Sequence, residues 1–136
     1  RSSGVDADAA INAETISRAA AELARKYHTT IIASGKTDIV TDGTRIVHVK
    51  NGTPQLSAVT GTGCLLGALC GAYLAVCADM NAAVTACVVL GICGQLAETP
   101  KGSGSFMMNL LDALSTLTDA QLDHYKDMEV PQHENL

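Results

Sequence analysis

Apolar residues recur every three or four positions in the first part of the chain, with polar and charged residues between them. From residue 6 to residue 28 this spacing predicts an amphipathic helix. The β-branched run TTIIAS at 29–34 follows directly and predicts a short buried strand, which Gly35 ends. The chain is therefore predicted to open with a helix that leads into a strand.

Two arms rich in β-branched residues come next, at 37–41 and 44–50, and they flank Asp42-Gly43. Because Asp-Gly is a strong signal for a two-residue turn, this segment predicts a β-hairpin. Pro54 cannot donate a hydrogen bond to a neighbouring strand and is interpreted as the end of the pairing.

Long apolar runs fill the second half of the sequence and predict a series of helices. The predicted helices span 64–78, 82–97 and 105–117. The turn at 79–81 separates the first two and can cap the second. Thr118-x-x-Gln121 has the pattern of a capping box and predicts one further short helix. The tail after Met128 is polar and is predicted to be frayed.

The order of these elements is helix, strand, hairpin and then several helices. This order resembles the C-terminal half of a layered α/β domain, because too few strands are predicted to cover all the apolar helices. No internal repeat or linker divides the sequence. Residues 1–136 are therefore predicted to form part of a single domain.

The composition excludes several classes of function. Apolar residues make up 47% of the 136 residues, which is too many for a disordered chain. Aromatic residues make up only 3%, too few for a surface that stacks nucleic-acid bases. The formal net charge of −5 argues against binding to nucleic acid or an anionic membrane through bulk charge.

The five cysteines form no Cys-x-x-Cys pair, which argues against a zinc site or a disulfide framework. All except Cys64 are expected to be small apolar residues inside helices, in a chain of the reducing cytosol. The polar N-terminal region predicts no signal peptide. The apolar runs of about 15 residues are shorter than the roughly 20 needed to cross a bilayer, so no membrane association is predicted.

The segment Gly61-Thr62-Gly63-Cys64 is the strongest candidate for chemistry. A glycine turn just before a helix leaves several backbone N–H groups unpaired and pointing the same way. Together with the helix dipole, these groups form an anion hole suited to phosphoryl transfer. The alternative is a turn that only packs a strand against a helix. Cys64 lies in the first turn of the helix, where it is expected to face the substrate.

The segment VTGTGCLLGALCGAYLA, preceded by IIASGKTDIVTDGTRIVHVKNG and followed by KGSGSFMMNLLDALSTL, closely resembles the C-terminal half of the hydroxyethylthiazole kinases. The resemblance runs from about residue 4 to about residue 122. TGTGC is its most specific part, because sugar kinases of the wider fold usually carry an aspartate where this sequence has Cys64. The resemblance implies the ribokinase-like α/β fold, of which residues 1–136 are the C-terminal part.

The resemblance also implies a reaction and its site. ATP, with Mg2+, is expected to phosphorylate the primary hydroxyl of 4-methyl-5-(2-hydroxyethyl)thiazole in thiamine biosynthesis and salvage. Gly61 would contact the thiazole alcohol, and the amides of Thr62, Gly63 and Cys64 would hold the transferring phosphoryl group. Cys64 would stand in the position of the catalytic base. Ser34 falls where the family often has a threonine that binds ATP.

Length is the one departure from the family pattern, because its members are much longer chains. The regions expected to supply the Mg2+ ligands and much of the thiazole pocket have no counterpart here, so no metal ligand is assigned. The resemblance implies a homo-oligomer, typically a trimer, that needs the N-terminal half. Two explanations of the length remain open: residues 1–136 are a fragment or one part of a split protein, or another chain completes the fold. The cysteine pattern favours a cytoplasmic location. Two alternatives remain: another ribokinase-like kinase, for hydroxymethylpyrimidine or a sugar, and a non-catalytic half-domain.

Overall fold

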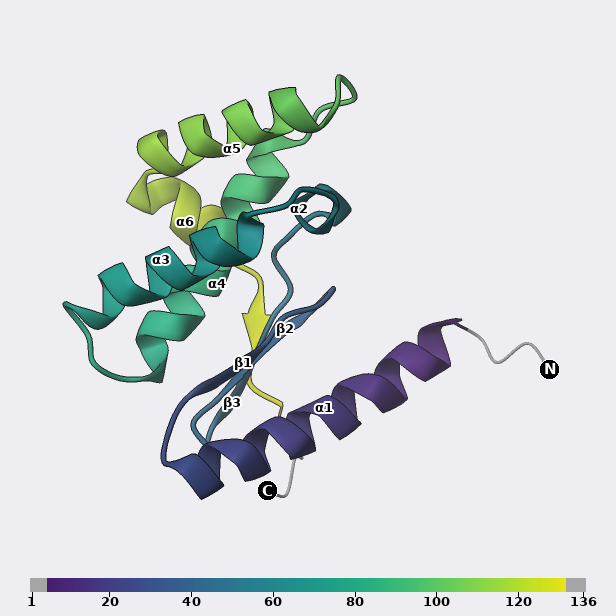
Figure 1. Cartoon of the computed structure of the whole chain (residues 1–136), viewed down its shortest axis with the longest axis vertical. Coiled ribbons are helices and arrows are strands. Elements are labelled where there is room, and N and C mark those ends of the chain that lie inside the picture. The colour runs from purple at the N-terminus through teal and green to yellow at the C-terminus, as the bar shows by residue number, and fades with distance from the viewer. Residues whose placement is uncertain (1–4, 132–136) are drawn as a thin grey trace.

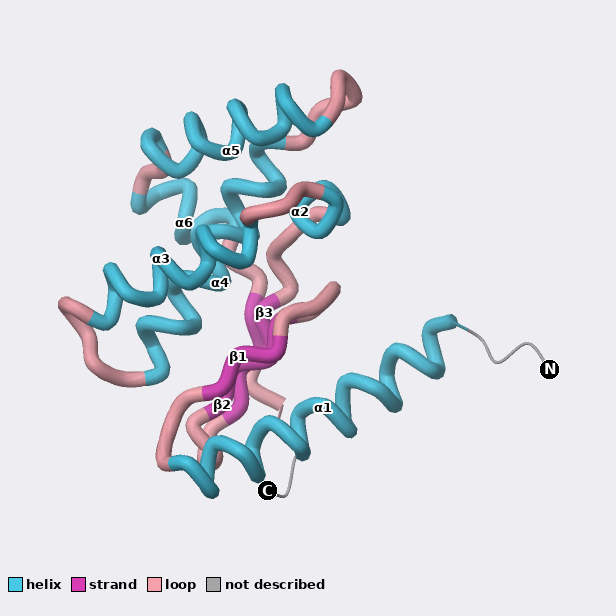
Figure 2. Tube along the Cα trace, in the orientation of Figure 1, coloured by secondary structure: helices cyan, strands magenta, loops and turns pink. Residues whose placement is uncertain are grey.

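The computed structural model describes the backbone of residues 5–131 and the side chains of residues 12–131 (Figure 1). The elements are α1 (Val5–Tyr27), β1 (Ile31–Ala33), β2 (Asp38–Thr41), β3 (Ile46–Val49), α2 (Pro54–Ala58), α3 (Thr62–Leu74), α4 (Met80–Ala97), α5 (Ser103–Thr116), α6 (Asp119–Tyr125) and β4 (Met128–Glu129). Figure 2 shows a small sheet with α1 on one side and the other helices gathered on the opposite side. This arrangement confirms the predicted α/β class.

The four strands form one antiparallel sheet in the order β1-β2-β3-β4. Val40 and Val47 are cross-strand partners, and both belong to the buried cluster that α4 covers. The adjacent pair, Ile39 and His48, faces the other side because side chains alternate along a strand. There Nε2 of His48 lies 3.3 Å from Oγ of Ser17 in α1. The sheet is therefore enclosed between α1 and α4.

α4 is the central helix of the core. Its Val84 and Val88 pack against the sheet, whereas Val89 and Cys93 pack against Phe106 and its neighbours in α5. By length and composition α4 could cross a membrane, but 78% of it is buried inside the chain. Such burial is typical of a core helix, because an α-helix that is apolar on every side is stable only when other elements cover it.

The first strand differs from its prediction. It spans Ile31–Ala33 rather than 29–34, and all three of its residues are only half-buried. The prediction of a buried strand was therefore wrong. The physical reason is that β1 lies at the edge of the sheet and pairs with β2 alone among the described strands.

The predicted hairpin is confirmed, but its turn is longer than two residues. Thr41 pairs with Ile46, which leaves four residues in the turn between them. Oδ1 of Asp42 accepts hydrogen bonds from the amides of Thr44 at 2.9 Å and Arg45 at 2.8 Å. The carboxylate thus satisfies two amides of the four-residue turn that the strands do not.

The short helix α2 is absent from the sequence-based prediction. Pro54 is its first residue, and Oγ1 of Thr53 accepts a hydrogen bond from the amide of Gln55 at 3.4 Å. Proline is favoured at the first position of a helix because its missing N–H would be unpaired there in any case. Pro54 therefore begins a helix as well as ending the strand pairing.

The next two helices are confirmed with shifted ends. α3 begins earlier and ends earlier, at Leu74, than the predicted range 64–78. α4 begins at Met80, so the predicted turn at 79–81 reduces to Asp79, whose carboxylate accepts from the amide of Asn81 at 2.7 Å. Asp79 is thus the predicted cap, and the helix starts immediately after it.

The capping box is confirmed at the start of α6, where Thr118 and Gln121 exchange hydrogen bonds between side chain and backbone. The predicted fraying after Met128 is wrong for the part that the structure describes. Met128 begins β4 and pairs with Val49 of β3. The prediction for residues 132–136 lies outside the described residues.

Candidate active site

The glycine turn predicted from the sequence lies between α2 and α3. Gly61 is the N-cap of α3 with φ = 102°, a left-handed conformation that favours glycine. Thr62 fixes the turn, because its Oγ1 donates to the carbonyl oxygens of Leu56 at 2.9 Å and Val59 at 3.3 Å. A side chain therefore joins the start of α3 to α2 by hydrogen bonds, and the backbone amides of the turn take no part in this contact.

The first helical hydrogen bond of α3 runs from the amide of Leu65 to the carbonyl of Gly61, at 3.1 Å. Among the described residues, the amides of Thr62, Gly63 and Cys64 have no hydrogen-bond acceptor. A Cβ placed on Gly61 or Gly63 would meet nothing within 4 Å, so side chains do not fill the space in front of these glycines. The geometry thus provides three open N–H donors at the positive end of a helix dipole.

Cys64 differs from the other four cysteines, as the sequence indicated. Its side chain is exposed in the first turn of α3, whereas Cys87 and Cys93 are buried. Burial raises the pKa of the Cys87 thiol to about 12 and that of Cys93 to about 11. The remaining two, Cys70 and Cys77, are only half-buried. The expectation that all four would lie inside helices was wrong for Cys77, because α3 ends at Leu74.

No side chain hydrogen-bonds to the Cys64 thiol within the described part of the chain. In particular, no histidine, lysine or carboxylate is paired with it in the manner of an activated nucleophile or base. The thiol therefore lies beside the open amides without a partner that would take its proton.

Ser34 lies in the loop that follows β1, and its side chain is exposed. Within the described residues no hydrogen bond joins it to the glycine turn, so the structure groups four of the five predicted site residues and places Ser34 on a separate loop. That loop has its own anchor, because Oδ1 of Asp38 accepts a hydrogen bond from the amide of Gly35 at 3.0 Å.

Asp38 has a structural role that the sequence did not reveal. Its carboxylate is half-buried, and this burial raises its pKa, while hydrogen bonds from the Gly35 amide and the Cys87 thiol lower it. The only signal in the sequence is the spacing Gly-x-x-Asp, which occurs in many loops. Asp38 thus fixes the loop next to Ser34 and connects it to α4.

A second glycine-led helix start occurs at α5. Gly102 is its N-cap with φ = 134°, no side chain caps it, and the first helical bond runs from the amide of Phe106 to the carbonyl of Gly102 at 3.0 Å. A Cβ on Gly102 or Gly104 would meet nothing within 4 Å. The segment 102–106 therefore also presents open backbone at the start of a helix.

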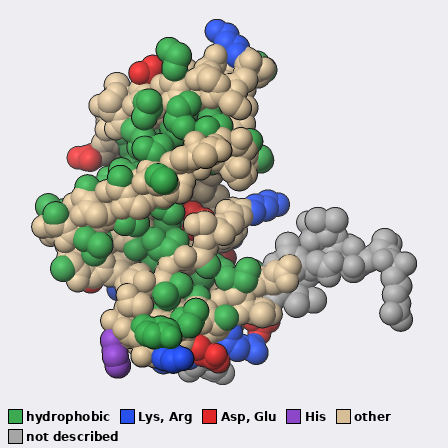
Figure 3. Space-filling model, viewed as in Figure 1, with side chains coloured by type: hydrophobic (Ala, Val, Ile, Leu, Met, Phe, Trp, Pro, Cys, Tyr) green, Lys and Arg blue, Asp and Glu red, His purple; other side chains and the backbone are tan. Residues whose placement is uncertain are grey.

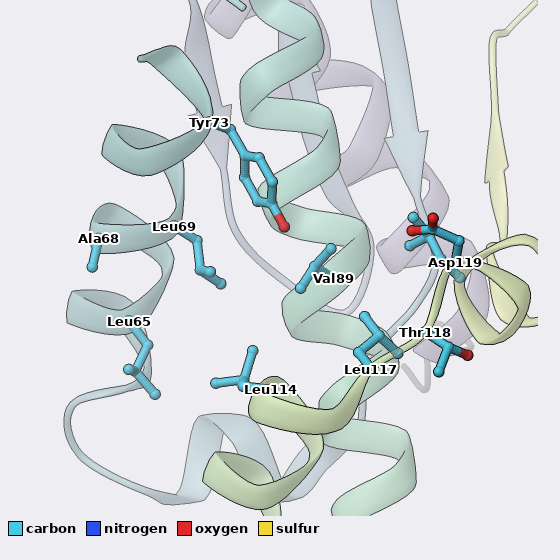
Figure 4. A pocket seen from close by; sticks show the side chains of 10 residues that line it. Leu65, Ala68, Leu69, Tyr73, Val89, Leu114, Leu117, Thr118 and Asp119 are labelled. Atoms are coloured by element: carbon cyan, nitrogen blue, oxygen red, sulfur yellow. The ribbon is translucent and has the colours of Figure 1, made fainter. Parts of the chain in front are cut away.

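A cavity of about 340 Å³ lies on the inner side of α3, where α3, α4, α5 and α6 meet (Figure 4). It is lined mainly by leucines, and Tyr73 extends its ring toward Val89 (Figure 4). None of the predicted site residues lines it. The candidate site is therefore the open end of α3 rather than this apolar cavity.

The described residues contain no group of three or more His, Cys, Asp or Glu side chains that could hold a metal ion. No residue of this part of the chain is therefore assigned to a metal ion.

Comparison with known proteins identifies relatives of this chain. The model of the hydroxyethylthiazole kinase family matches residues 1–120. A hydroxyethylthiazole kinase of Thermoanaerobacter pseudethanolicus is 43% identical over 121 residues, which cover 86% of this chain and 46% of that protein. One from Methanocorpusculum labreanum is 45% identical over 100 residues, which cover 73% of this chain and 38% of the relative.

A solved structure of the same family is also similar to this chain in its fold. The hydroxyethylthiazole kinase protein from Pyrococcus horikoshii superimposes with a TM-score of 0.85 at 34% sequence identity. The match covers 89% of this chain and 48% of that one. The chain thus spans about half the length of the relatives that it matches.

Proposed function

The chain belongs to the hydroxyethylthiazole kinase family, and on that premise we propose that it carries the phosphoryl-transfer site of an ATP-dependent kinase. The acceptor is the primary hydroxyl of 4-methyl-5-(2-hydroxyethyl)thiazole, in thiamine biosynthesis and salvage. Residues 1–136 are the C-terminal part of a single ribokinase-like domain. The observation that carries this proposal is the set of open amides at Thr62, Gly63 and Cys64.

These three amides stabilise negative charge on the phosphoryl group as it moves from ATP to the alcohol. The transition state of phosphoryl transfer is loose, with charge spread over the equatorial oxygens, so catalysis depends mainly on positioning and electrostatic stabilisation. Donors that are already oriented stabilise this charge without reorganisation. Gly61 contacts the thiazole alcohol, because the absence of a Cβ lets the substrate approach the backbone.

Cys64 takes the position of the catalytic base, but its contribution is at most equal to that of the amides. In a loose transition state the alcohol keeps its proton until late, so a base has little to remove early. General-base help is worth roughly 10²–10⁴-fold, and one oxyanion-hole donor about 10²–10³-fold. The absence of a hydrogen-bonded partner for the thiol among the described residues supports this ranking.

The nucleotide lies between the loop after β1 and the start of α5. Ser34 is exposed at the end of β1, and its hydroxyl can donate to a phosphate or a ribose. The open amides of α5 after Gly102 flank the nucleotide on the other side. Asp38 holds the loop in place through the Gly35 amide.

Mg2+ accompanies ATP in this proposal, and we assign most of its ligands to polypeptide outside this chain. The polypeptide that corresponds to the N-terminal half of the relatives supplies those ligands and much of the thiazole pocket. The completed protein is a cytoplasmic homo-oligomer, and the 136-residue chain alone binds ATP weakly and has no turnover.

The test uses a completed kinase, defined as residues 1–136 joined to the N-terminal half of the Thermoanaerobacter pseudethanolicus relative. It is assayed with hydroxyethylthiazole, hydroxymethylpyrimidine and a panel of sugars as acceptors. We expect turnover with the thiazole alone. Preference for a pyrimidine or a sugar would replace the proposed substrate, and a lack of any turnover would favour a non-catalytic half-domain.

Nucleotide binding is tested separately by hydrogen exchange with ATP and Mg2+ in the completed kinase. Protection of the amides at 62–64 is expected, because those donors would bind a phosphate. Unchanged exchange at 62–64 during nucleotide binding would show that the glycine turn only packs.

A further inference from the structure

The side-chain amide of Gln55 in α2 forms two hydrogen bonds with one residue of the loop between α4 and α5. Its Nε2 donates to the carbonyl of Thr99 at 2.7 Å, and the backbone amide of Thr99 donates to its Oε1 at 3.1 Å. The two residues are 44 positions apart in the chain, so only the fold brings them together. Because a planar amide group here donates and accepts at the same partner, the pairing fixes both the distance and the orientation of the two segments.

α2 is also joined to the glycine turn and to α4. Oγ1 of Thr62 donates to the carbonyl of Leu56, the residue after Gln55, at 2.9 Å. The side chain of Leu56 lies directly against α4, because a Cβ on Gly94 would be 2.6 Å from its Cδ1. The position of α2 therefore determines where the glycine turn lies relative to the end of α4.

The loop that contains Thr99 leads directly into α5. Oγ1 of Thr99 accepts a hydrogen bond from the amide of Lys101 at 3.3 Å, and Lys101 precedes Gly102, the N-cap of α5. At the start of the loop, Nδ2 of Asn109 in α5 donates to the carbonyl of Ala97 at 3.2 Å. Thr99 is therefore the point at which α2 fixes the loop before the start of α5.

Gln55 connects the two glycine-led helix starts, at 61–64 and at 102–104. The contacts run from Thr62 through α2 and Gln55 to Thr99. Figure 3, drawn in the same view as Figure 1, shows charged side chains mainly at the margins of the face that carries α2, α3 and α5, with hydrophobic side chains between them. Phosphate binding on this face would therefore depend on backbone amides, and each amide moves with its helix. The spacing of the two helix starts decides whether both can reach one ligand.

We propose that Gln55 is a positioning residue for the nucleotide, whose side-chain amide sets the spacing between the phosphoryl-binding turn and the start of α5. Its oxygen and its nitrogen already bond to Thr99, so it acts through the loop rather than on the substrate. A displacement of about 1 Å in a group that positions a substrate can cost roughly 10²-fold in rate. This role rests on the proposed function, because it treats the two helix starts as parts of one nucleotide site.

The test replaces Gln55 in the completed kinase and measures steady-state kinetics. Gln55→Leu keeps a side chain of similar length, favours a helix and removes both hydrogen bonds to Thr99. We expect the KM for ATP to rise at least tenfold, while the KM for the acceptor alcohol stays within twofold of the unmodified enzyme. A general loss of folded enzyme would lower kcat and leave both KM values unchanged, and that result would overturn the proposal.

Two further variants separate the pairing with Thr99 from a general effect on α2. At pH 8, Gln55→Glu keeps an oxygen for the Thr99 amide but lacks a donor for the Thr99 carbonyl, so its KM for ATP should lie between those of the unmodified enzyme and the leucine variant. Ser57→Ala is the matched control, because Oγ of Ser57 donates within α2, to the carbonyl of Pro54 at 2.9 Å. It should leave both KM values within twofold. Equal increases for Ser57→Ala and Gln55→Leu would overturn the proposal.

Calorimetric binding of a non-hydrolysable ATP analogue with Mg2+ distinguishes this role from the proposed function. We expect Gln55→Leu to bind the analogue at least tenfold more weakly than the unmodified enzyme. Thiazole turnover with unchanged analogue affinity in the leucine variant would keep the proposed function and overturn the role of Gln55. Weaker analogue binding by that variant, in an enzyme that does not phosphorylate the thiazole, would support the role of Gln55 and count against the proposed acceptor. A completed kinase that binds no nucleotide would overturn both.

Discussion

The side-chain amide of Asn51 donates a hydrogen bond of 2.8 Å to Oε1 of Gln95, which joins the chain after β3 to the last turn of α4. The same amide donates to the carbonyl of Tyr125 at 2.8 Å, and Oδ1 accepts from the amide of Asp127 at 2.7 Å. Asn51 is 4% exposed, so each of these bonds replaces one that water would otherwise provide. One buried side chain thus holds the sheet, α4 and α6 together.

Asn51→Leu should therefore destabilise the chain by about 2–3 kcal/mol, because it leaves a buried carbonyl and an amide without partners. Urea unfolding followed by circular dichroism measures the loss. Asn109→Ala is the matched control, since Asn109 makes a single hydrogen bond, to the carbonyl of Ala97. An unchanged urea midpoint for the leucine variant would show that the network contributes nothing to stability.

Gly91 lies against the same asparagine and should be intolerant of a side chain. A Cβ at Gly91 would lie 2.6 Å from both Cβ and the carbonyl oxygen of Asn51. Gly91→Ala should therefore cost about 1–3 kcal/mol, as overpacking does in other cores. Gly71→Ala, where the same group meets open space, should stabilise the chain by up to about 1 kcal/mol. Thermal unfolding of the two variants should show shifts of opposite sign.

The raised pKa of Asp38 predicts that the stability of the chain depends on pH. Because burial raises its pKa in the folded chain, the folded state binds more protons than the unfolded state between the ordinary pKa and the raised one. The contribution of Asp38 to the free energy of unfolding is therefore fully present below its ordinary pKa and is lost as pH rises through the raised value. Asp38→Asn should abolish this contribution and should gain stability relative to the unmodified chain as pH rises from 3.5 to 7, in the approximate range where carboxylates titrate.

Unfolding of the Asp38→Asn variant and of the unmodified chain across this pH range gives the test. The asparagine keeps an oxygen that can accept from the Gly35 amide, so the loop should stay in place. If the difference between the two chains were independent of pH, burial would not control the ionisation of Asp38.

The five thiols should react with an alkylating reagent at different rates at pH 8. Cys64 is exposed and should react first with an alkylating reagent. A pKa of about 12 leaves roughly one part in ten thousand of Cys87 as the reactive thiolate. Mass spectrometry of peptides should find Cys87 and Cys93 unmodified until denaturant is added. Rapid labelling of Cys87 in the native chain would contradict its burial.

Two substitutions in the completed kinase rank the amides against the thiol. Gly63→Val places a branched side chain in the space before the amides and should abolish turnover, whereas Cys64→Ser should retain measurable activity. The open space around Gly63 means that the valine variant can fold, so its loss of activity would reflect the site. Steady-state rates decide between the two groups, and an inactive serine variant beside an active valine variant would reverse the ranking.

The elements with local signals could be predicted from the sequence. Helical spacing predicts α1, the cap at Asp79 predicts the start of α4, and the capping box predicts α6. The glycine turn is predicted by two glycines placed just before an apolar run. α2 and β4 could not be predicted, because tertiary partners stabilise them. Leu56 in α2 accepts from Thr62, and β4 consists of two residues that are ordered by pairing with β3.

The candidate site also has a part that the sequence predicts and a part that depends on the fold. The residues from Gly61 to Cys64 are consecutive, so their local geometry follows from the sequence. The relation of Ser34 to that turn does not, because it depends on how β1 and α3 are placed by elements between them. The role of Asp38 was missed because its partners, the Gly35 amide and Cys87, come together only in the fold.

The pairing of β3 with β4 has a consequence for synthesis on the ribosome. The side chains of Lys50 and Glu129, which bond across this pairing, are 79 residues apart in the chain. At roughly 5–20 residues per second, translation leaves the outer edge of β3 exposed for about 4–16 s after that strand emerges. The hairpin can form early, but the last strand follows five further helices, so the outer edge of β3 stays unpaired in the nascent chain until β4 has been synthesised.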